Sequence, residues 1–504
     1  MKKSIVFALT TSLLFVSGCN SKKEIDQKGA NVFPYSEIDG SLSVTMGDVM
    51  PFYDNGVMNI YHLRNVTGSN SLFYHPIARL TTSDYIHYEN KGISLNYEED
   101  ITSVDAALGT GSFIKDKDGT YHCFYTGHND KAHDEDLKGA GLEHVEVIRH
   151  ATSKDGQATW QKDEDFLLYG YEDDFRDPYV YYDNIDECYY MLITSRDYGN
   201  AVIRRYSSKS LSAKDDEWVF TDNFFTNDEG SYNMECPSFI QYGKYYYLAY
   251  SEQGDNRVTH YRYKDSHDGA WKKFDRDAID ASGFYAGRLE KAGDKLFAFA
   301  WCARLTGGNT GGFDWAGNLV THELIQKENG ELCAVMPSTY KEYFKNEVKY
   351  QTNESKDIKE YNFLGEGIKA TALDRLSENV TRMSFTANIK ELKGNFGITF
   401  GLSNQYNNRL GDGLLAFDLV NNKLVCYNNV SSVLRYGSEL TSVSYPFELN
   451  KDYQVDVIVD GEVASLYLNG EVALTVRLIN MENNYFAFYS NNAKADIKEV
   501  KFYE

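Results

Sequence analysis

The stretch Phe175-Arg176-Asp177-Pro178 combines residue types that can hold a sugar. It directly precedes an aromatic run, Tyr179–Tyr182, which is typical of a β-strand because aromatic and β-branched residues suit a pleated surface. Pro178 fits the first residue of a strand, where a missing N–H breaks no ladder hydrogen bond. Asp177 would accept hydrogen bonds from two adjacent hydroxyls, and Arg176 would donate in a fork. A strand cap beside a surface ion pair is the alternative for these two residues alone.

Two further acids, Asp48 and Glu235, stand at equivalent places. Each begins a stretch in which a polar strand start leads through a turn into a second, aromatic strand. Two carboxylates that flank a glycosidic bond can cleave it, one as nucleophile and the other as general acid and base. Taken singly, each acid is better explained as a solvated residue at a strand end. Their shared place in a repeat favours a site.

The repeat has five units, each a hairpin with a turn such as Asp-Asn-Gly, Asp-Gly or Gly-Lys between alternating hydrophobic residues. The units start 63, 66, 58 and 52 residues apart, at Asp48, Gly111, Asp177, Glu235 and Gly287. A regular period of short strands is the signature of a β-propeller, so we predict five blades over residues 41–338. Because the innermost strands of a propeller line one channel, the three acids should meet at one mouth.

The composition and the residue pattern of the chain change after residue 338. Residues 339–361 are charged and lack blade features, so we predict a linker there. Residues 362–504 alternate polar and apolar side chains and contain the hairpin turns Asp460-Gly461 and Asn469-Gly470. The eight strands predicted here are Thr381–Ile389, Phe396–Leu402, Leu414–Leu419, Lys423–Tyr427, Tyr453–Val459, Ala464–Leu468, Tyr485–Tyr489 and Ala495–Phe502. The predicted fold is therefore all-β, an N-terminal five-bladed β-propeller followed by a C-terminal β-sandwich.

The first residues have the features of a targeting segment. Lys2-Lys3 supplies a positive region, and Ile5–Val16 supplies an apolar core that is too short for a transmembrane helix. The next residues, Val16-Ser17-Gly18-Cys19, are similar to a bacterial lipobox, in which the cysteine is lipidated. We therefore expect a lipoprotein signal peptide at 1–18 and a tether at 19–40, with the protein lipid-anchored to a bacterial membrane outside the cytoplasm. An ordinary secretory signal with an incidental cysteine is the alternative.

Composition limits the partners. The net charge of −23 argues against nucleic acid or an anionic membrane surface and suits a neutral substrate such as a glycan. The cysteines after Cys19 show no metal-ligand spacing, so we expect buried core residues, no metal and no cofactor. These six are Cys123, Cys188, Cys236, Cys302, Cys333 and Cys426.

Phe175–Pro178 and Glu235-Cys236-Pro237 resemble two signatures of glycoside hydrolase family 32, the invertases, inulinases and levanases. Further stretches within about residues 44–335 agree with the family in the same order. They are Phe124-Tyr125-Thr126-Gly127, Ser153 to Gly156 with Trp160 and Lys162, Gly283-Phe284-Tyr285-Ala286, and Trp315 to Gly317 with Glu323-Leu324.

The resemblance implies a retaining glycoside hydrolase that cleaves β-fructosidic bonds in fructans or fructo-oligosaccharides. Asp48 would be the nucleophile, and Glu235 would be the general acid and base. Arg176 and Asp177 would hold the fructose hydroxyls and stabilise the transition state. The pKa of Glu235 should be raised by burial and by Asp48 nearby, since it must carry a proton when substrate binds.

Ser112 and Trp315 fall in further family motifs and would contact substrate. The family's first motif, Trp-Met-Asn-Asp-Pro-Asn-Gly, corresponds to Val44–Pro51, in which the aspartate is kept. Its Phe-Ser-Gly-Ser stretch corresponds to Gly109–Ser112, and the glutamine that ends the next strand falls near Leu63. These differences touch the fructose subsite and allow an unusual linkage or substrate.

Two other functions stay open on these residues. The altered first motif allows a non-catalytic glycan-binding lipoprotein, and three acids also occur in five-bladed glycosidases that act on arabinose- or xylose-containing glycans. The insert Gly127–Val147 is rich in histidine and acidic residues, but its spacing fits no metal site. We expect it to be an exposed loop on the pocket rim.

Overall fold

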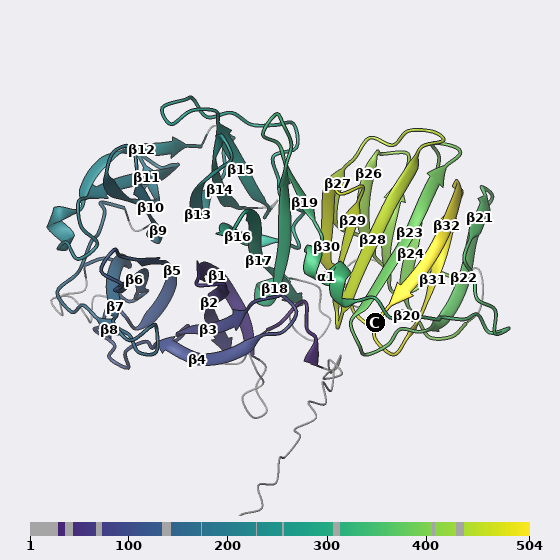
Figure 1. The fold of residues 1–504 in the computed structure, drawn as a ribbon, viewed down its shortest axis with the longest axis horizontal. Helices are drawn as coiled ribbons and strands as arrows, with labels where there is room; N and C mark the ends of the chain where they lie inside the picture. Colours follow the sequence, from purple (N-terminus) through teal and green to yellow (C-terminus); the bar gives the residue numbers. More distant parts are fainter. Residues whose placement is uncertain are drawn as a thin grey trace, which may run out of the picture.

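The computed structural model describes residues 29–35, 44–66, 73–133, 143–172, 174–227, 229–254, 257–305, 313–405, 409–429 and 438–504. The chain forms two β-rich units that lie side by side (Figure 1). In the first, four sheets surround a common centre, the largest of which joins the first and last of five blades, and in the second, two sheets face one another. This arrangement confirms the predicted propeller followed by a sandwich.

Each blade begins with its innermost strand, and successive strands pair antiparallel outward. The first blade has β1 Val44–Asp54, β2 Val57–Val66, β3 Ile77–Thr82 and β4 Glu89–Leu95, and the second has β5 Ala107–Lys115, β6 Tyr121–His128, β7 Glu146–Ser153 and β8 Gln161–Lys162. The third has β9 Phe175–Asp183, β10 Cys188–Asp197, β11 Asn200–Ser208 and β12 Val219–Thr226, with the 3₁₀ turn η3 Asp215–Glu217. The fourth has β13 Asn233–Tyr242, β14 Tyr245–Gln253 and β15 Thr259–Lys264, and the fifth has β16 Tyr285–Ala292, β17 Lys295–Leu305, β18 Phe313–Gln326 and β19 Leu332–Val335. The first and last blades meet where Met46 pairs with Gly317, which closes the ring.

The inner hairpins follow from their turn residues. Asn55 and Gly56 both have positive φ, 51° and 84°, as a two-residue type I′ turn requires. Asp54 ends β1 at this turn and accepts hydrogen bonds from Lys115 and the Tyr121 hydroxyl. It therefore belongs to the hairpin and not to the acids at the other end of the strand.

All five innermost strands carry a β-bulge at the same level. In each, two residues face a single residue on the neighbouring strand, and the bulged pairs are 47–48, 109–110, 177–178, 236–237 and 286–287. Pro178 and Pro237 occupy two of the bulges, where a missing N–H is tolerated. A bulge bends its strand and re-aims the side chains beside it. The repeat therefore places five distortions around one mouth of the channel.

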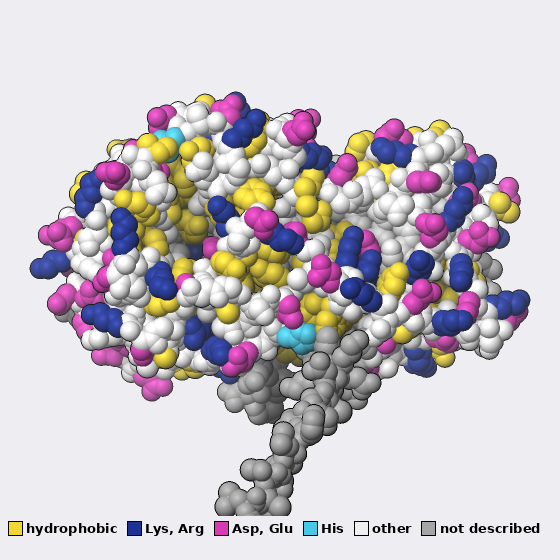
Figure 2. All heavy atoms as spheres, viewed as in Figure 1, with side chains coloured by type: hydrophobic (Ala, Val, Ile, Leu, Met, Phe, Trp, Pro, Cys, Tyr) yellow, Lys and Arg dark blue, Asp and Glu magenta, His cyan; other side chains and the backbone are white. Residues whose placement is uncertain are grey.

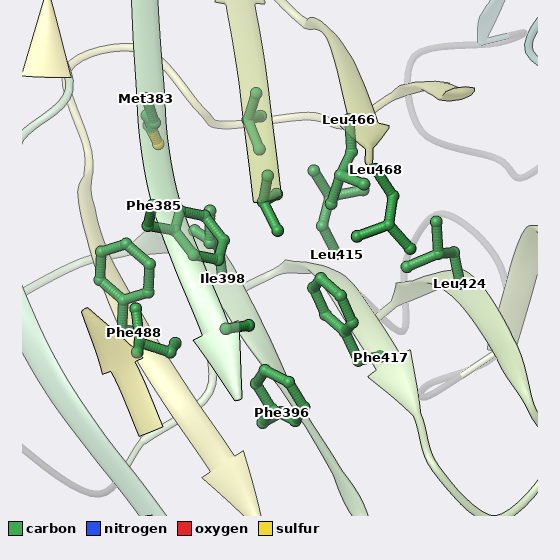
Figure 3. Close-up of a cluster of buried hydrophobic side chains, with 14 of the residues drawn as sticks. Met383, Phe385, Phe396, Ile398, Leu415, Phe417, Leu424, Leu466, Leu468 and Phe488 are labelled. Carbon is green, nitrogen blue, oxygen red and sulfur yellow. The ribbon is translucent and has the colours of Figure 1, made fainter. Parts of the chain in front are cut away.

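The second unit is a sandwich of a seven-stranded and a six-stranded sheet. Its strands are β20 Glu347–Val348, β21 Tyr361–Leu364, β22 Ile368–Arg375, β23 Thr381–Ile389, β24 Asn395–Leu402, β25 Gly413–Asp418, β26 Lys423–Asn428, β27 Ser438–Ser444, β28 Asp452–Asp460, β29 Val463–Leu468, β30 Val472–Arg477, β31 Tyr485–Asn491 and β32 Lys494–Tyr503. Between the sheets, aromatic and aliphatic side chains such as Phe385, Phe417 and Leu466 form a buried core (Figure 3).

The eight sandwich strands expected from alternation are present, and β20, β21, β22, β27 and β30 were missed. The stretch expected to be a linker carries the helix α1, Ser338–Tyr343, and the short strand β20. Tyr340 is fully buried and Tyr350 is almost so. This stretch is therefore packed against its surroundings, which charge content alone did not indicate.

The six cysteines of the described ranges are all buried and unpaired, as predicted. Among the residues that the structure describes, no helix is long and apolar enough to cross a membrane.

A buried polar network joins the two units. Asp280, in the loop before β16, and His322, on β18, are both fully buried, and their side chains lie 2.9 Å apart. The other ring nitrogen of His322 lies 3.0 Å from the Tyr467 hydroxyl of the sandwich. The backbone N–H of Thr475 on β30 donates to Asp280 Oδ1 at 3.0 Å. The loop before β16 is thus anchored to the sandwich.

The substitution Asp280→Ala should destabilise the protein by about 3–5 kcal/mol, because it leaves His322 and two buried N–H groups without their acceptor. Thermal unfolding followed by circular dichroism measures the effect. Asp294→Ala, at an exposed turn residue of the same charge, is the control and should change Tm little. Equal Tm values for the two variants would contradict this role of the network.

Candidate functional site

The bulged ends of the inner strands surround one pocket with a volume of about 280 Å³. Asp48, Asp177 and Glu235 all line it, although they lie on three different blades. The remaining lining residues are Leu63, Tyr74, His75, Ala107, Leu108, Gly109, Thr110, Thr126, His128, Glu146, Arg176 and Trp315. The tertiary structure therefore brings together the three acids that the repeat predicted.

Asp48 is held by two donors. The indole Nε1–H of Trp301, on β17, donates to Asp48 Oδ1 at 2.8 Å, and the Thr110 hydroxyl donates to Oδ2 at 2.8 Å. Burial raises the pKa of Asp48, and the negative charge of Glu235 raises it further, whereas the two hydrogen bonds lower it. Both carboxylate oxygens are thus oriented by groups that favour the ionised form.

Glu235 is held by a cation and a phenol. Arg176 Nη2 donates to Oε1 at 2.8 Å, and the Tyr285 hydroxyl donates to Oε2 at 2.5 Å. Burial raises the pKa of Glu235, and Asp177 adds to the rise, while Arg176 and the Tyr285 hydrogen bond oppose it. The net direction is upward and burial is its largest cause, as predicted, but the neighbouring acid that adds to the rise is Asp177 and not Asp48. A protonated Glu235 keeps its contact with Tyr285, because a phenol hydroxyl both donates and accepts.

Asp177 takes part in the bulge of β9. Its φ is +60°, a left-handed conformation that costs energy for a residue other than glycine. Its backbone N–H donates to the Thr126 hydroxyl at 3.0 Å, and its Oδ2 accepts the backbone N–H of Cys236 at 2.9 Å. Burial raises the pKa of Asp177, as does Asp48, against the opposing charges of Arg176 and Arg288.

Cys236 belongs to the next bulge, with φ +53°. Its side chain is buried in a cluster with Tyr285, Ala286 and Trp301, which confirms packing as the role of the thiol. Its backbone has a second role that the sequence did not reveal, because its N–H orients the Asp177 carboxylate.

Arg176 is surrounded by carboxylates. Its Nη1 donates to Asp174 at 2.6 Å and to Glu146 at 3.1 Å, and its Nη2 donates to Glu235 and to the Gln253 amide oxygen. In this structure Arg176 fixes the position of Glu235. Its contact with fructose hydroxyls stays a prediction.

Arg288 is a second buried cation, on β16 below the pocket. Its guanidinium donates to the carbonyl oxygens of Gly111 and Asp177 and so ties three innermost strands together. Its charge also lowers the pKa of Asp48 and Asp177. Arg288 lies just after the fifth bulge, and no motif singled it out.

Of the two other residues predicted to bind substrate, one lies in the pocket. Trp315 lines the rim, and its ring centroid lies 4.4 Å from that of His75. A Cβ at Gly47 would lie 2.2 Å from Trp315 Cη2, so only glycine permits this approach. Ser112 lies outside the pocket, because its hydroxyl accepts the backbone N–H of Val180 at 3.0 Å and braces β5 against β9.

Thr110 stands where the family's Phe-Ser-Gly-Ser stretch has its first serine. It is the second residue of the bulge on β5, as Asp48 is on β1, and this shared position is the signal that could have identified it. The repeat could also have identified Tyr285 and Trp301 as site residues, because they pair with one another at the start of the fifth hairpin, next to its bulge. Glu146 and His128, at the two ends of the predicted rim loop, line the pocket.

Two of the rim's groups carry shifted pKa values. Burial lowers the pKa of His75 to about 3, so its ring is neutral near pH 7. Burial would raise the pKa of Glu146, but Arg176 and His128 lower it overall. The described part of the predicted rim loop thus contributes charge to the pocket, while residues 134–142 and Cys19 lie outside the described residues.

Residues 50–333 match the family model described as "Glycosyl hydrolases family 32 N-terminal domain". The sucrose-6-phosphate hydrolase of Escherichia coli is 32% identical over 185 residues, which cover 35% of this chain and 35% of that protein. The levanbiose-producing levanase of Geobacillus stearothermophilus is 25% identical over 225 residues, covering 41% of this chain and 47% of that protein. The alignments span about a third to a half of these relatives' lengths.

Solved structures share the fold over almost the whole chain. The GH32 β-fructofuranosidase BmSUC1 of Bombyx mori has a TM-score of 0.67 at 17% identity, covering 92% of this chain and 93% of its own. The exo-inulinase of Aspergillus awamori has a TM-score of 0.67 at 15% identity, covering 91% and 95%. This likeness concerns the fold.

Proposed function

The chain belongs to glycosyl hydrolase family 32, and we propose that it is a retaining glycoside hydrolase that cleaves β-fructosidic bonds in fructans or fructo-oligosaccharides. The observation that carries the proposal is that two acids line one pocket and each is oriented by two hydrogen-bond partners. Asp48 receives hydrogen bonds from Trp301 and Thr110, and Glu235 receives hydrogen bonds from Arg176 and Tyr285. Two such carboxyl groups at one site can share the work of glycoside cleavage, one as nucleophile and the other as general acid and base.

In the first half of the reaction, Asp48 attacks the anomeric carbon of the fructosyl unit. The bond from that carbon to the leaving oxygen breaks, and Glu235 gives its proton to the oxygen. A covalent fructosyl–Asp48 ester results. As negative charge leaves Asp48, the two hydrogen bonds that it accepts keep its carboxyl group aligned.

In the second half, Glu235 is a carboxylate and removes a proton from water. The water oxygen attacks the anomeric carbon, the ester bond to Asp48 breaks, and fructose leaves with its configuration retained. Arg176 stabilises the anionic Glu235 at this stage, because its Nη2 already donates to Oε1. Asp177, oriented by the Cys236 N–H, is placed to accept hydrogen bonds from fructose hydroxyls.

Relatives named levanase and invertase support a fructoside as substrate. Leu63 in the pocket wall, near which the family's glutamine would fall, and Thr110 in place of the family's serine distinguish this fructose subsite from the family motifs. We therefore propose fructans or fructo-oligosaccharides as the substrate class and expect the linkage preference to follow from this wall.

The substitutions Glu235→Gln and Asp48→Asn should each lower fructose release from levan, inulin or sucrose by several orders of magnitude, because each removes one of the two carboxyl groups. Chromatography of the released sugars measures the effect and also separates fructose from oligomers or pentose. The matched control is Asp54→Asn, at the hairpin turn of the same strand, which should stay active. Full turnover in either of the first two variants would exclude this mechanism, and saturable binding of fructan without products from the wild type would favour a binding protein.

The substitution Tyr285→Phe should move the alkaline limb of the pH profile of kcat/KM upward by about half to one unit. The removed hydrogen bond lowers the pKa of Glu235, so its loss raises that pKa and keeps the general acid protonated to higher pH. Tyr190→Phe removes a phenol–carboxylate bond to Asp186 near the turn of the β9–β10 hairpin, at the opposite end from Asp177, and serves as control. An unchanged or lowered alkaline limb in Tyr285→Phe would contradict this assignment.

We further propose that the protein is held outside the cytoplasm by a lipid on Cys19, which the lipobox-like sequence supports. Metabolic labelling with a radioactive fatty acid should mark the wild type and leave Cys19→Ala unlabelled. Label in the Cys19→Ala variant would exclude this residue as the anchor.

A further inference from the structure

The exposed aromatic side chains gather at the third blade of the propeller. Within the described ranges they are Tyr35, Tyr169, Tyr171, Tyr198, Phe220 and Tyr232. All but Tyr35 belong to the blade β9–β12 or to the loops on either side of it. In the view of Figure 2, hydrophobic side chains, a class that includes tyrosine there, gather over the propeller more than over the sandwich. A group of large side chains left in water marks a binding surface.

Four of these side chains lie on the side of the catalytic mouth. Tyr198 is in the turn between β10 and β11, at the end of β10 that pairs with the start of β9. Tyr232 directly precedes β13, and Tyr169 and Tyr171 precede β9. The starts of β9 and β13 carry two of the three pocket acids. Tyr169 stacks on the His144 ring at 4.2 Å between centroids, which leaves three tyrosines as the open rings.

Tyr198 occupies a position that the fold by itself disfavours. Tyr198 and Gly199 have φ values of 48° and 81°, the left-handed conformations of a two-residue type I′ turn. The first position of such a turn favours Asn, Asp or Gly, and a bulky residue with positive φ is strained. The Tyr198 side chain is 96% exposed, so packing does not offset this strain. A strained residue that adds nothing to the core indicates a function.

Arg196 holds Tyr232 beside this turn. Its guanidinium carbon lies 3.7 Å from the centroid of the Tyr232 ring. Its Nη2 donates to the backbone oxygen of Tyr232 at 2.8 Å, and its Nη1 donates to that of Gly199 at 3.3 Å. One arginine thus covers one face of the Tyr232 ring and brings the residue next to Tyr198. Tyr232 is still 60% exposed, which leaves the other face of its ring open.

The same arginine connects the tyrosines with the catalytic pocket. Arg196 Nε donates to Asp174 Oδ2 at 2.8 Å. Asp174 Oδ1 accepts from Arg176 at 2.6 Å and from the Asn233 amide at 3.0 Å. Arg176 in turn binds Glu235. The exposed rings are therefore fixed to the wall of the pocket, although none of them lines it.

The chemistry of this surface suits an uncharged sugar chain. A tyrosine ring offers an apolar face to the C–H side of a sugar and a hydroxyl to its alcohols. The exposed aliphatic residues of the described part of this blade, Ile185 and Val219, lie at its opposite end, so the mouth side is not a continuous apolar patch. The net charge of −23 disfavours an anionic polymer.

We propose that Tyr171, Tyr198 and Tyr232 form an aromatic platform that binds an extended fructan chain outside the catalytic pocket. This inference rests on the proposed function, since the chain that the platform holds is the one whose end enters the pocket. Sugar units remote from the cleaved bond lie on the platform. Two contacts on one chain raise the affinity through effective concentration, whereas a short sugar occupies the pocket alone.

Isothermal titration calorimetry in a Glu235→Gln background, which prevents turnover, tests the platform with levan, inulin and the trisaccharide 1-kestose. The double substitution Tyr198→Asn and Tyr232→Ala should weaken binding of the polymer by about tenfold and leave binding of 1-kestose unchanged. Phe220→Ala is the matched control. It removes an exposed aromatic ring of the same blade at the opposite end and should leave binding of both probes unchanged.

Thermal unfolding separates binding from a structural role. Tyr198→Asn introduces a residue that a type I′ turn prefers, so it should keep or raise Tm while it lowers fructan affinity. Polymer affinity that is unchanged in the double variant, or no higher than that for 1-kestose, would overturn the proposal. Hydrolysis of 1-kestose by the wild type is measured separately. Tyrosine-dependent fructan binding without hydrolysis would reject the proposed activity and not the platform, and hydrolysis without such binding would reject the platform alone.

Discussion

The site depends on the cost of burying several carboxylates at one mouth of a channel. Asp48, Asp177 and Glu235 repel one another there, and burial disfavours the charged form of each. Arg176 and Arg288 offset this cost from two sides, one beside Glu235 and one below the pocket. The balance leaves the pKa of each acid raised. In such a cluster of buried acids, one carboxyl group can be ionised while another is protonated. Glycoside cleavage requires this combination.

The β-bulges set the directions of the side chains at the starts of the five repeated hairpins. In an unbroken strand, side chains alternate strictly, so the adjacent residues Arg176 and Asp177, which both line the pocket, would point to opposite faces. The β-bulges interrupt this alternation beside the pocket, because in each of them two residues of the inner strand face one residue of the next strand. The left-handed conformations of Asp177, Cys236 and Ala286 are the conformational cost of that geometry.

The sandwich contacts the loop before β16, and this loop leads directly to the catalytic pocket. Asp280 is anchored to β30 and to His322, Gly283 packs against the backbone of Thr475 too closely for any side chain, and Tyr285 follows at once. The hydroxyl of Tyr285 binds the general acid. The second unit therefore does more than cover an edge of the propeller, since it anchors the loop from which the partner of Glu235 emerges.

The sequence by itself determined the fold class, the five inner hairpins and the convergence of Asp48, Asp177 and Glu235, because strand alternation, turn residues and a repeat period are local properties. It did not reveal Trp301, Arg288 or the backbone N–H of Cys236 as partners of these acids, and it placed Ser112 in a pocket that Thr110 occupies. Those relations join residues from different blades at bulges. Which atoms meet there is decided by tertiary packing, since a bulge shifts the register that local pattern predicts.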